Sequence, residues 1–283
     1  MKIIKTYQQC AQLILIFCAL SFSFGSQAAL ITMASDDANN YGNQWLGNGG
    51  NGFDDWSFNT DSAGGSAGNF LANKSNHGDL NHIASNPSDN AWGTYANGNG
   101  FNQFEAYRGF SSNSLTQAGD VFQLSFEHGA ITQGGSVGFS LRNQNIHNAV
   151  GDYNQLSRFE FGFIGGGQYY SIFDGQGVTD TGINYTDAGL NLTFTLLTPD
   201  LYQIDIFNAF DNSFIQTRNG SLNGSGSIDS VSLYNRDAEL ANAYFNGLSI
   251  SKNSVEVSEP SIWLLLSFGI FGLFLSNKLK QNF

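Results

Sequence analysis

Apolar and polar residues alternate along much of the chain after residue 100. Phe122, Leu124 and Phe126, for example, are separated by Gln123 and Ser125. Because successive side chains of a strand point to opposite faces, each such run predicts a strand with one apolar and one polar face. Similar runs occupy residues 137–141, 159–163, 192–196, 202–206, 213–217, 228–234 and 244–250.

Turn-forming residues separate these runs and are frequent in residues 32–100. Stretches rich in Asn, Ser and Gly lie at residues 48–52, 62–66 and 97–100. Gly and Asn tolerate a positive φ, so such stretches predict turns. The pattern predicts an all-β domain at residues 30–253, an antiparallel two-sheet sandwich of jelly-roll or lectin-like type. Residues 32–100 form either strands of this sandwich or a loop cap.

The N-terminal segment has the pattern of a secretory signal peptide. Lys2 and Lys5 precede an apolar stretch at residues 13–24, and small residues follow around Ala28. This order predicts a signal helix at residues 1–29 that the Sec machinery reads and a signal peptidase removes. Both cysteines of the chain lie inside this segment. The mature protein is therefore expected to contain no disulfide and no thiolate site.

The C-terminal segment has three parts, a short polar motif, an apolar stretch and a basic end. Residues 262–275 are apolar and span about 21 Å as a helix, and Lys278 and Lys280 follow them. The chain thus predicts a linker and sorting signal at residues 254–283 with a short transmembrane helix at 262–275. The motif before the helix consists of Ser258, Glu259, Pro260 and Ser261.

This C-terminal arrangement resembles the PEP-CTERM sorting signal of Gram-negative bacteria. The resemblance covers only the tail. It implies an exosortase-like processing enzyme as a partner and transient anchoring in the inner membrane. It also implies a final location at the cell surface or in the extracellular matrix, where exopolysaccharide is made.

The charge of the chain excludes one large class of partners. The sequence holds 23 acidic and 11 basic residues, for a net charge of −12. Four of the lysines lie in the two terminal segments, so the predicted domain is more acidic still. An acidic surface repels phosphate backbones, and we therefore expect no nucleic-acid partner.

An acidic, Asn-rich region near the start of the domain suggests a metal site. Calcium prefers six to eight oxygen ligands, which Asp, Asn and loop carbonyls supply. The alternative is a solvated turn region in which these side chains cap local backbone. No cofactor is certain from the sequence; the candidate ligands of a structural calcium are Asp36, Asp37, Asp54 and Asp55.

A second group of residues suggests carbohydrate binding. Sugar rings stack on exposed aromatic faces, and amide and carboxylate side chains hydrogen-bond their hydroxyls. Within residues 102–108 the strand pattern places Gln103, Glu105 and Tyr107 on one face. The alternative is that the aromatic residues belong to the core or its rim. The candidate binding residues are Trp92, Gln103, Glu105 and Tyr107.

Catalysis has weaker support in the sequence. Glycoside hydrolases need two carboxylates flanking the scissile bond. Glu105, Glu127 and Glu160 lie in predicted strands, but no Glu-x-Asp-x-x-Glu run is present. The first hypothesis is therefore a non-catalytic surface protein that binds or organises extracellular polysaccharide. The alternatives are a structural or adhesive biofilm protein acting through protein contacts, and a glycoside hydrolase with an unrecognised carboxylate pair.

Overall fold

The computed structural model describes residues 29–84, 89–146, 156–239 and 241–253. Residues 31–252 form one compact unit. The predicted signal helix, sorting motif and apolar segment 262–275 all lie outside the described residues. Among the residues that are described, no helix is long and apolar enough to cross a membrane.

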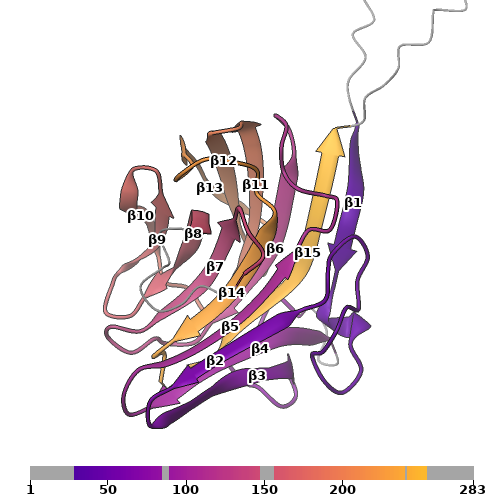
Figure 1. Ribbon diagram of the computed structural model, residues 1–283. Helices are drawn as coiled ribbons and strands as arrows, with labels where there is room; N and C mark the ends of the chain where they lie inside the picture. Colours follow the sequence, from indigo (N-terminus) through magenta and orange to yellow (C-terminus); the bar gives the residue numbers. More distant parts are fainter. Residues whose placement is uncertain (1–28, 85–88, 147–155, 240, 254–283) are drawn as a thin grey trace, which may run out of the picture. The chain divides into compact units, whose positions relative to one another are not determined.

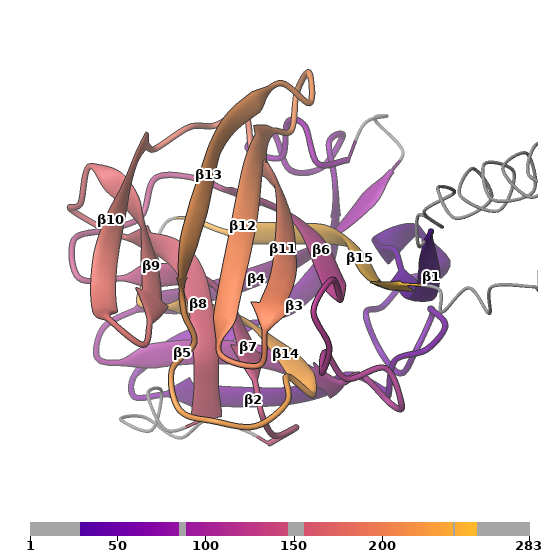
Figure 2. The ribbon, with the colours of Figure 1, turned by 90° about the horizontal axis from the view of Figure 1, so that it is seen from above.

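The compact unit is an antiparallel β-sandwich, as the sequence predicts (Figures 1 and 2). One sheet, called sheet A here, has eight strands, seven of them in the order β13-β12-β11-β6-β15-β4-β3, with β1 paired to β15. The bounds of its strands are β1 (Leu30–Asp36), β3 (Gly65–Asn73), β4 (Asn90–Gly98), β6 (Val121–His128), β11 (Leu190–Thr198), β12 (Leu201–Asn208), β13 (Phe214–Ser221) and β15 (Ala243–Asn253).

The second sheet, sheet B, has seven strands in the order β10-β9-β8-β7-β14-β5-β2. A short 3-10 helix, η1 (Ala38–Asn40), follows β1. The bounds of the sheet B strands are β2 (Ser57–Ser62), β5 (Asn102–Gly109), β7 (Ser136–Arg142), β8 (Ser157–Ile164), β9 (Tyr169–Asp174), β10 (Gly177–Asn184) and β14 (Ser230–Arg236).

The apolar positions of the alternating runs form the core between the two sheets. Phe122, Leu124 and Phe126 of β6 are at most 2% exposed, and Phe159 and Phe161 of β8 are fully buried. Aromatic rings contact one another across this layer; those of Phe159 and Phe194, from opposite sheets, lie 5.1 Å apart. Burial of these side chains is the main force that holds the sheets together.

Residues 32–100 are part of the sandwich rather than a loop cap. They supply β1 to sheet A, β2 to sheet B, and the pair β3 and β4 to the edge of sheet A opposite β13. The intervening segment adds Trp45 and Trp56 to the core, where their rings lie 5.1 Å apart edge to face. The strands β1 and β15 pair, so the chain enters and leaves the compact unit on neighbouring strands.

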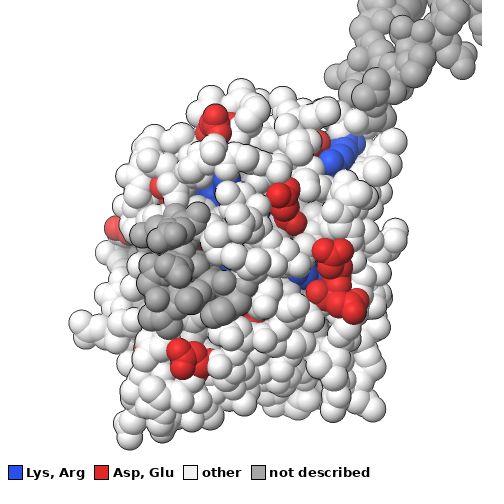
Figure 3. All heavy atoms as spheres, viewed as in Figure 1, with Lys and Arg blue, Asp and Glu red and all other residues white. Residues whose placement is uncertain are grey.

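Charged side chains are sparse on the face of the molecule that Figure 3 shows. Acidic groups are scattered over it, with several gathered at the right of the view, and Lys and Arg are few. The low content of charged residues, 12% of the sequence, explains this appearance.

Candidate functional site

Two of the four predicted calcium ligands, Asp36 and Asp54, contact an arginine. Arg108 of β5 is fully buried, and its Nη1 lies 2.5 Å from Asp36 Oδ2. Its Nε donates to the Asp54 carbonyl at 2.9 Å, and its Nη2 donates to Asn48 Oδ1 at 2.6 Å. The rings of Phe53 and Trp56 lie 4.7 and 4.6 Å from the guanidinium carbon. The cation that these oxygens hold is therefore a side chain of the protein itself.

The other predicted ligands have local roles. The Asp37 side chain accepts from the Asn39 amide at 2.8 Å and caps η1. The Asp54 carboxylate accepts from Ser111 Oγ at 2.6 Å, and Asp55 is exposed. In the part of the chain that the structure describes, no group of three or more His, Cys, Asp and Glu side chains could hold a metal ion. The structure thus brings Asp36 and Asp54 together around Arg108, and calcium binding in this region stays a prediction.

Trp92 cannot serve as a sugar platform. It lies on β4, is fully buried, and stacks on Trp45 with ring centroids 5.8 Å apart. Its side chain faces the core because Trp92 pairs with Phe245 of β15, another core residue. Trp92 therefore belongs to the core, which is one of the two alternatives that the sequence left open.

Gln103, Glu105 and Tyr107 do share one face, the outer face of sheet B. However, Gln103 and Glu105 are 1% and 0% exposed, and only Tyr107 is partly accessible. The Glu105 carboxylate lies 2.5 Å from Arg142 Nη2 and accepts from Ser232 Oγ at 2.7 Å. Glu105 is thus paired within the protein and Gln103 is covered, so these two groups offer little to a polymer arriving from solvent.

Glu160 of β8 extends the same buried network. It lies on the outer face of sheet B opposite Ser140, whose hydroxyl is 2.7 Å from that of Ser157. Burial raises the pKa of Glu160 to about 7, although the Ser157 hydrogen bond and the charge of Arg142 oppose the shift. The predicted glutamates of sheet B therefore belong to a buried polar cluster.

Glu127, on the outer face of sheet A, has a structural role. Its carboxylate accepts from the backbone amides of Asn81, His82 and Ile83 at 2.6, 3.0 and 3.2 Å. This fixes the loop before β4 over one part of the sheet, where Leu80 and Tyr244 form a small apolar cluster.

The rest of the outer face of sheet A carries an accessible row of polar side chains. The strand registers place five of them side by side, one from each of β15, β6, β11, β12 and β13. Gln123 is exposed and the other four are half-buried. In order across the sheet they are Ser249, Gln123, Thr193, Asp205 and Thr217.

A second row lies beside the first, two residues along β6, β11 and β12 and three along β13, where the register shifts. It begins with Ser125 and Asn191 and ends with the aromatic residues Phe207 and Phe214. Phe214 is 60% exposed, and its ring centroid lies 5.6 Å from that of Phe207. We call these two rows, which together contain nine side chains, the polar platform.

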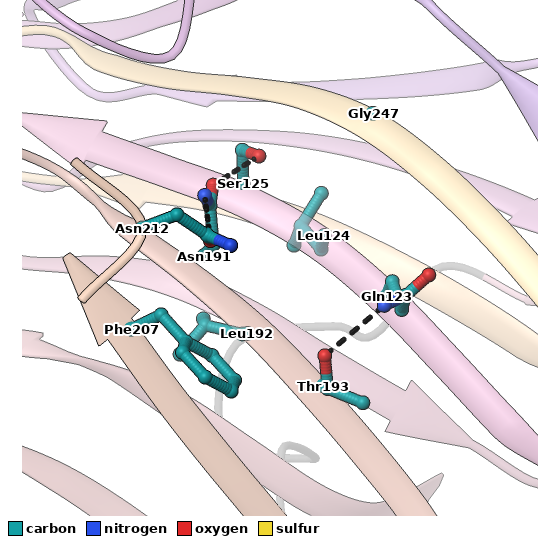
Figure 4. Close-up of a pocket in the computed structure, with 9 residues that line it drawn as sticks. All are labelled: Gln123, Leu124, Ser125, Asn191, Leu192, Thr193, Phe207, Asn212 and Gly247. Carbon is teal, nitrogen blue, oxygen red and sulfur yellow. Dashed lines mark hydrogen bonds between the residues drawn. The ribbon is translucent and has the colours of Figure 1, made fainter. Parts of the chain in front are cut away.

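A hollow with a volume of ≈ 350 Å³ lies on one part of the platform. Figure 4 shows the residues that line it, among them five of the platform, namely Gln123, Ser125, Asn191, Thr193 and Phe207. Ser125 Oγ donates to Asn191 Oδ1 at 2.7 Å, and Asn191 Nδ2 donates to Asn212 Oδ1 at 3.2 Å. Gly247 of β15 borders the hollow and has a φ of +64°. Amide and hydroxyl groups thus surround a shallow depression beside the Phe207 ring.

The sequence indicated which platform residues point outward, but only strand pairing brings them together. Gln123, Ser125 and Asp205 occupy the polar positions of alternating runs, so an outward orientation was predictable. Their proximity was not, because β6 and β11 are far apart in the sequence and pair only in the tertiary structure.

Comparisons with known proteins add a general likeness of fold. No protein-family model and no curated protein matches the chain. Among solved structures, the chain is similar to the VIP36 exoplasmic/lumenal domain in its Ca2+/Man3GlcNAc-bound form. The TM-score is 0.45 at 8% identity, covering 73% of this chain and 88% of that chain.

Two other solved structures are comparably distant. A legume lectin-like domain from Entamoeba histolytica gives a TM-score of 0.40 at 10% identity, covering 70% of this chain and 90% of that chain. The binding domain of botulinum neurotoxin DC, in complex with rat synaptotagmin II, gives 0.39 at 12% identity, with 71% and 44% covered. At this distance the function must be inferred from the chain's own residues.

Proposed function

We propose that this protein binds extracellular polysaccharide, without catalysis, on the polar platform of sheet A. The observation that supports this most directly is the accessible row of side chains from Ser249 to Thr217 beside an exposed aromatic pair. Amides and hydroxyls both donate and accept hydrogen bonds, as sugar hydroxyls require. Phe207 and Phe214 offer ring faces and edges on which the apolar side of a sugar packs.

The proposed location is the cell surface or extracellular matrix of a Gram-negative bacterium. The support is the sequence alone, namely the signal-peptide pattern at residues 1–29 and the PEP-CTERM-like motif at residues 258–261. On this proposal the Sec machinery and an exosortase-like enzyme process the two ends. Loss of surface display after replacement of Glu259 and Pro260 by alanine would support it, and unchanged display would contradict it.

Affinity electrophoresis of the full chain through gels that contain the host's exopolysaccharide tests the function. We expect retardation of the wild type, about tenfold weaker for Phe207→Ala because ring packing contributes on the order of 1–2 kcal/mol. Phe173→Ala is the matched control, since Phe173 is a half-buried phenylalanine on sheet B. Trp92→Ala is unsuitable because it would open a cavity in the core.

The same gels run with a chelator test the role of calcium. Because Arg108 takes the oxygens of the predicted metal cluster, we expect the same retardation with EDTA as with added calcium. Retardation that requires calcium would restore a metal site. Absence of retardation in every condition would refute the proposed function.

A structural or adhesive role is the second candidate, and one observation favours it. Strand β13 ends sheet A in the described part of the chain and exposes Phe214 and Ile215, and Phe210 before it is 71% exposed. An exposed apolar edge is a template for pairing with another chain. A concentration-dependent increase in mass during sedimentation, lost in Ile215→Lys, would support this role.

A further inference from the structure

We infer that the polar platform takes internal stretches of a linear, uncharged polysaccharide that lies across the strands. This inference rests on the function proposed above and adds the class of glycan and the direction of binding. It is carried by three features of the platform, namely the lateral continuity of its first row, its charge, and the sheet edge at which it ends.

The strand registers make the first row continuous, and hydrogen bonds link it in two segments, one from β15 to β11 and one between β12 and β13. Ser249 Oγ donates to Gln123 Oε1 at 3.1 Å, and Gln123 Nε2 donates to Thr193 Oγ1 at 3.1 Å. Further along, Thr217 Oγ1 donates to Asp205 Oδ1 at 2.5 Å. These bonds hold the side chains in position before a ligand arrives, which lowers the entropic cost of binding. Their line runs perpendicular to the strands.

The length of the row suits an oligosaccharide rather than a single sugar. Neighbouring strands are about 4.8 Å apart, so the four intervals between β15 and β13 extend over about 19 Å. A ligand that uses the whole row must therefore be elongated and must cross the strands. A monosaccharide would contact only one or two of the five side chains.

The charge of the platform selects an uncharged chain. Among its nine residues Asp205 is the only charged one, and none is Lys or Arg. Binding of carboxylate or sulfate groups normally requires such cations. Arg218 of β13 does not supply one, because it pairs with the core residue Ile204 and donates to the Thr181 carbonyl of the other sheet. An acidic polysaccharide would be repelled by Asp205 and by the net charge of the protein.

Because the platform ends at a sheet edge, binding does not require the terminal sugar of the polysaccharide. In the described residues β13 has no further strand beside it, so the row continues directly into solvent. A polymer can leave the platform there without meeting a wall. The site is thus suited to the middle of a chain, in contrast to an enclosed pocket that recognises a terminal sugar.

A fragment series tests this inference on the full chain. The host's exopolysaccharide is partly hydrolysed and separated by charge and by size, from monosaccharide to hexasaccharide, and binding is measured by calorimetry. We expect the neutral fragments to bind at least tenfold more tightly as hexasaccharide than as disaccharide. Reduction of the terminal sugar should leave the affinity of the long fragments unchanged, and added salt should have little effect.

Two variants locate the effect. Thr193→Lys places a cation in the centre of the row and should raise the affinity for acidic fragments severalfold while it weakens neutral binding. Thr195→Lys is the matched control, because Thr195 lies on the same face of β11 next to the row, opposite Val121 and Gln203. It should leave the affinity for neutral fragments within about twofold of the wild type.

The outcomes separate the inference from the function on which it rests. Equal affinity for disaccharide and hexasaccharide, preference for the acidic fraction, or loss of binding on reduction of the chain end would overturn the inference and leave glycan binding intact. Failure of every fraction to bind, neutral or acidic, would remove the proposed function itself.

Discussion

At the scale of single residues, Arg108 is a buried charge that several oxygen acceptors hold in place. Its guanidinium collects a carboxylate, a carbonyl and a side-chain amide oxygen, and two aromatic rings cover it. From the sequence, acidic and amide residues in a loop favour calcium just as well. The sequence does not show that Arg108 lies beside this loop, because the contact forms only when β5 packs against it in the folded protein.

The arginine cluster should be important for stability. Arg108→Met leaves Asp36 buried without its partner, and we expect a loss of about 3–5 kcal/mol in the free energy of unfolding. Urea denaturation measures it. The double variant Asp36→Asn with Arg108→Met should recover part of the loss, because the unpaired charge is gone.

An ion pair between a buried arginine and an exposed aspartate provides the control for this cluster. Arg158 lies 3.0 Å from Asp200, whose side chain is 69% exposed. Asp200→Asn should therefore cost less than about 1 kcal/mol. A similarly small cost for Arg108→Met would show that the buried cluster does not stabilise the fold.

Two buried groups should give opposite dependences of stability on pH. Burial raises the pKa of Glu160 from 4.5 to about 7 and lowers the pKa of His128 from 6.5 to about 4. The folded state therefore favours the neutral form of each group, because burial disfavours the charged form. The contribution of Glu160 is therefore complete below pH 4.5 and is lost as the pH rises through 7. That of His128 is complete above pH 6.5 and is lost as the pH falls through 4.

These two trends overlap, so the wild type should change little in stability between pH 4.5 and 6.5. Glu160→Gln keeps a neutral side chain and should leave only the rise with pH that His128 causes. The difference in unfolding free energy between wild type and variant should change by about 3 kcal/mol from pH 4.5 to pH 7. Parallel curves for the two proteins would contradict the assignment to Glu160.

At the scale of elements, the bulge in β15 was not predictable from the alternating pattern. The pairing of β15 with β6 shifts register between Asn246 and Ser249, and Gly247 lies there with a φ of +64°. An added Cβ would lie 3.7 Å from Ser125 Oγ, so space is available and only the backbone conformation is restrictive. Glycine is the residue that adopts this conformation without cost.

Replacement of this glycine tests the role of the bulge. Gly247→Ala should lower the free energy of unfolding by about 1 kcal/mol, because an alanine resists the left-handed conformation. Thermal unfolding measures it. Gly78→Ala is the control, since an added Cβ there meets nothing within 4 Å and no positive φ is recorded for Gly78. Equal effects of the two substitutions would argue against a conformational role for Gly247.

The strands of residues 32–100 illustrate the limits of periodicity. Ser57–Ser62 and Gly65–Asn73 form β2 and β3, yet their burial patterns are mostly intermediate or exposed. Each lies at the edge of its sheet, where few side chains reach the core. Edge strands carry little apolar alternation, so their composition resembles that of loops.

At the scale of the whole molecule, the order of strands determines which polar faces are accessible. Sheet A places the outward residues of five neighbouring strands, from β15 to β13, into one open surface. Sheet B places Gln103, Glu105, Arg142 and Glu160 into a buried network. Both sets are polar positions of similar alternating runs. The sequence favoured the sheet B residues as the binding site because Tyr107 lies on the same face. The structure favours sheet A instead, because its outward polar residues are accessible and those of sheet B are buried.

The sequence alone determined the fold class and the membership of the core. Alternation places Phe122, Leu124, Phe159 and Phe161 inward whatever strands they pair with, because a strand turns successive side chains to opposite faces. The tertiary structure alone decided the partners. It joined Arg108 to Asp36, buried Trp92, and aligned Gln123, Thr193 and Asp205 across the sheet. Such contacts depend on pairing between distant segments, which local patterns do not encode.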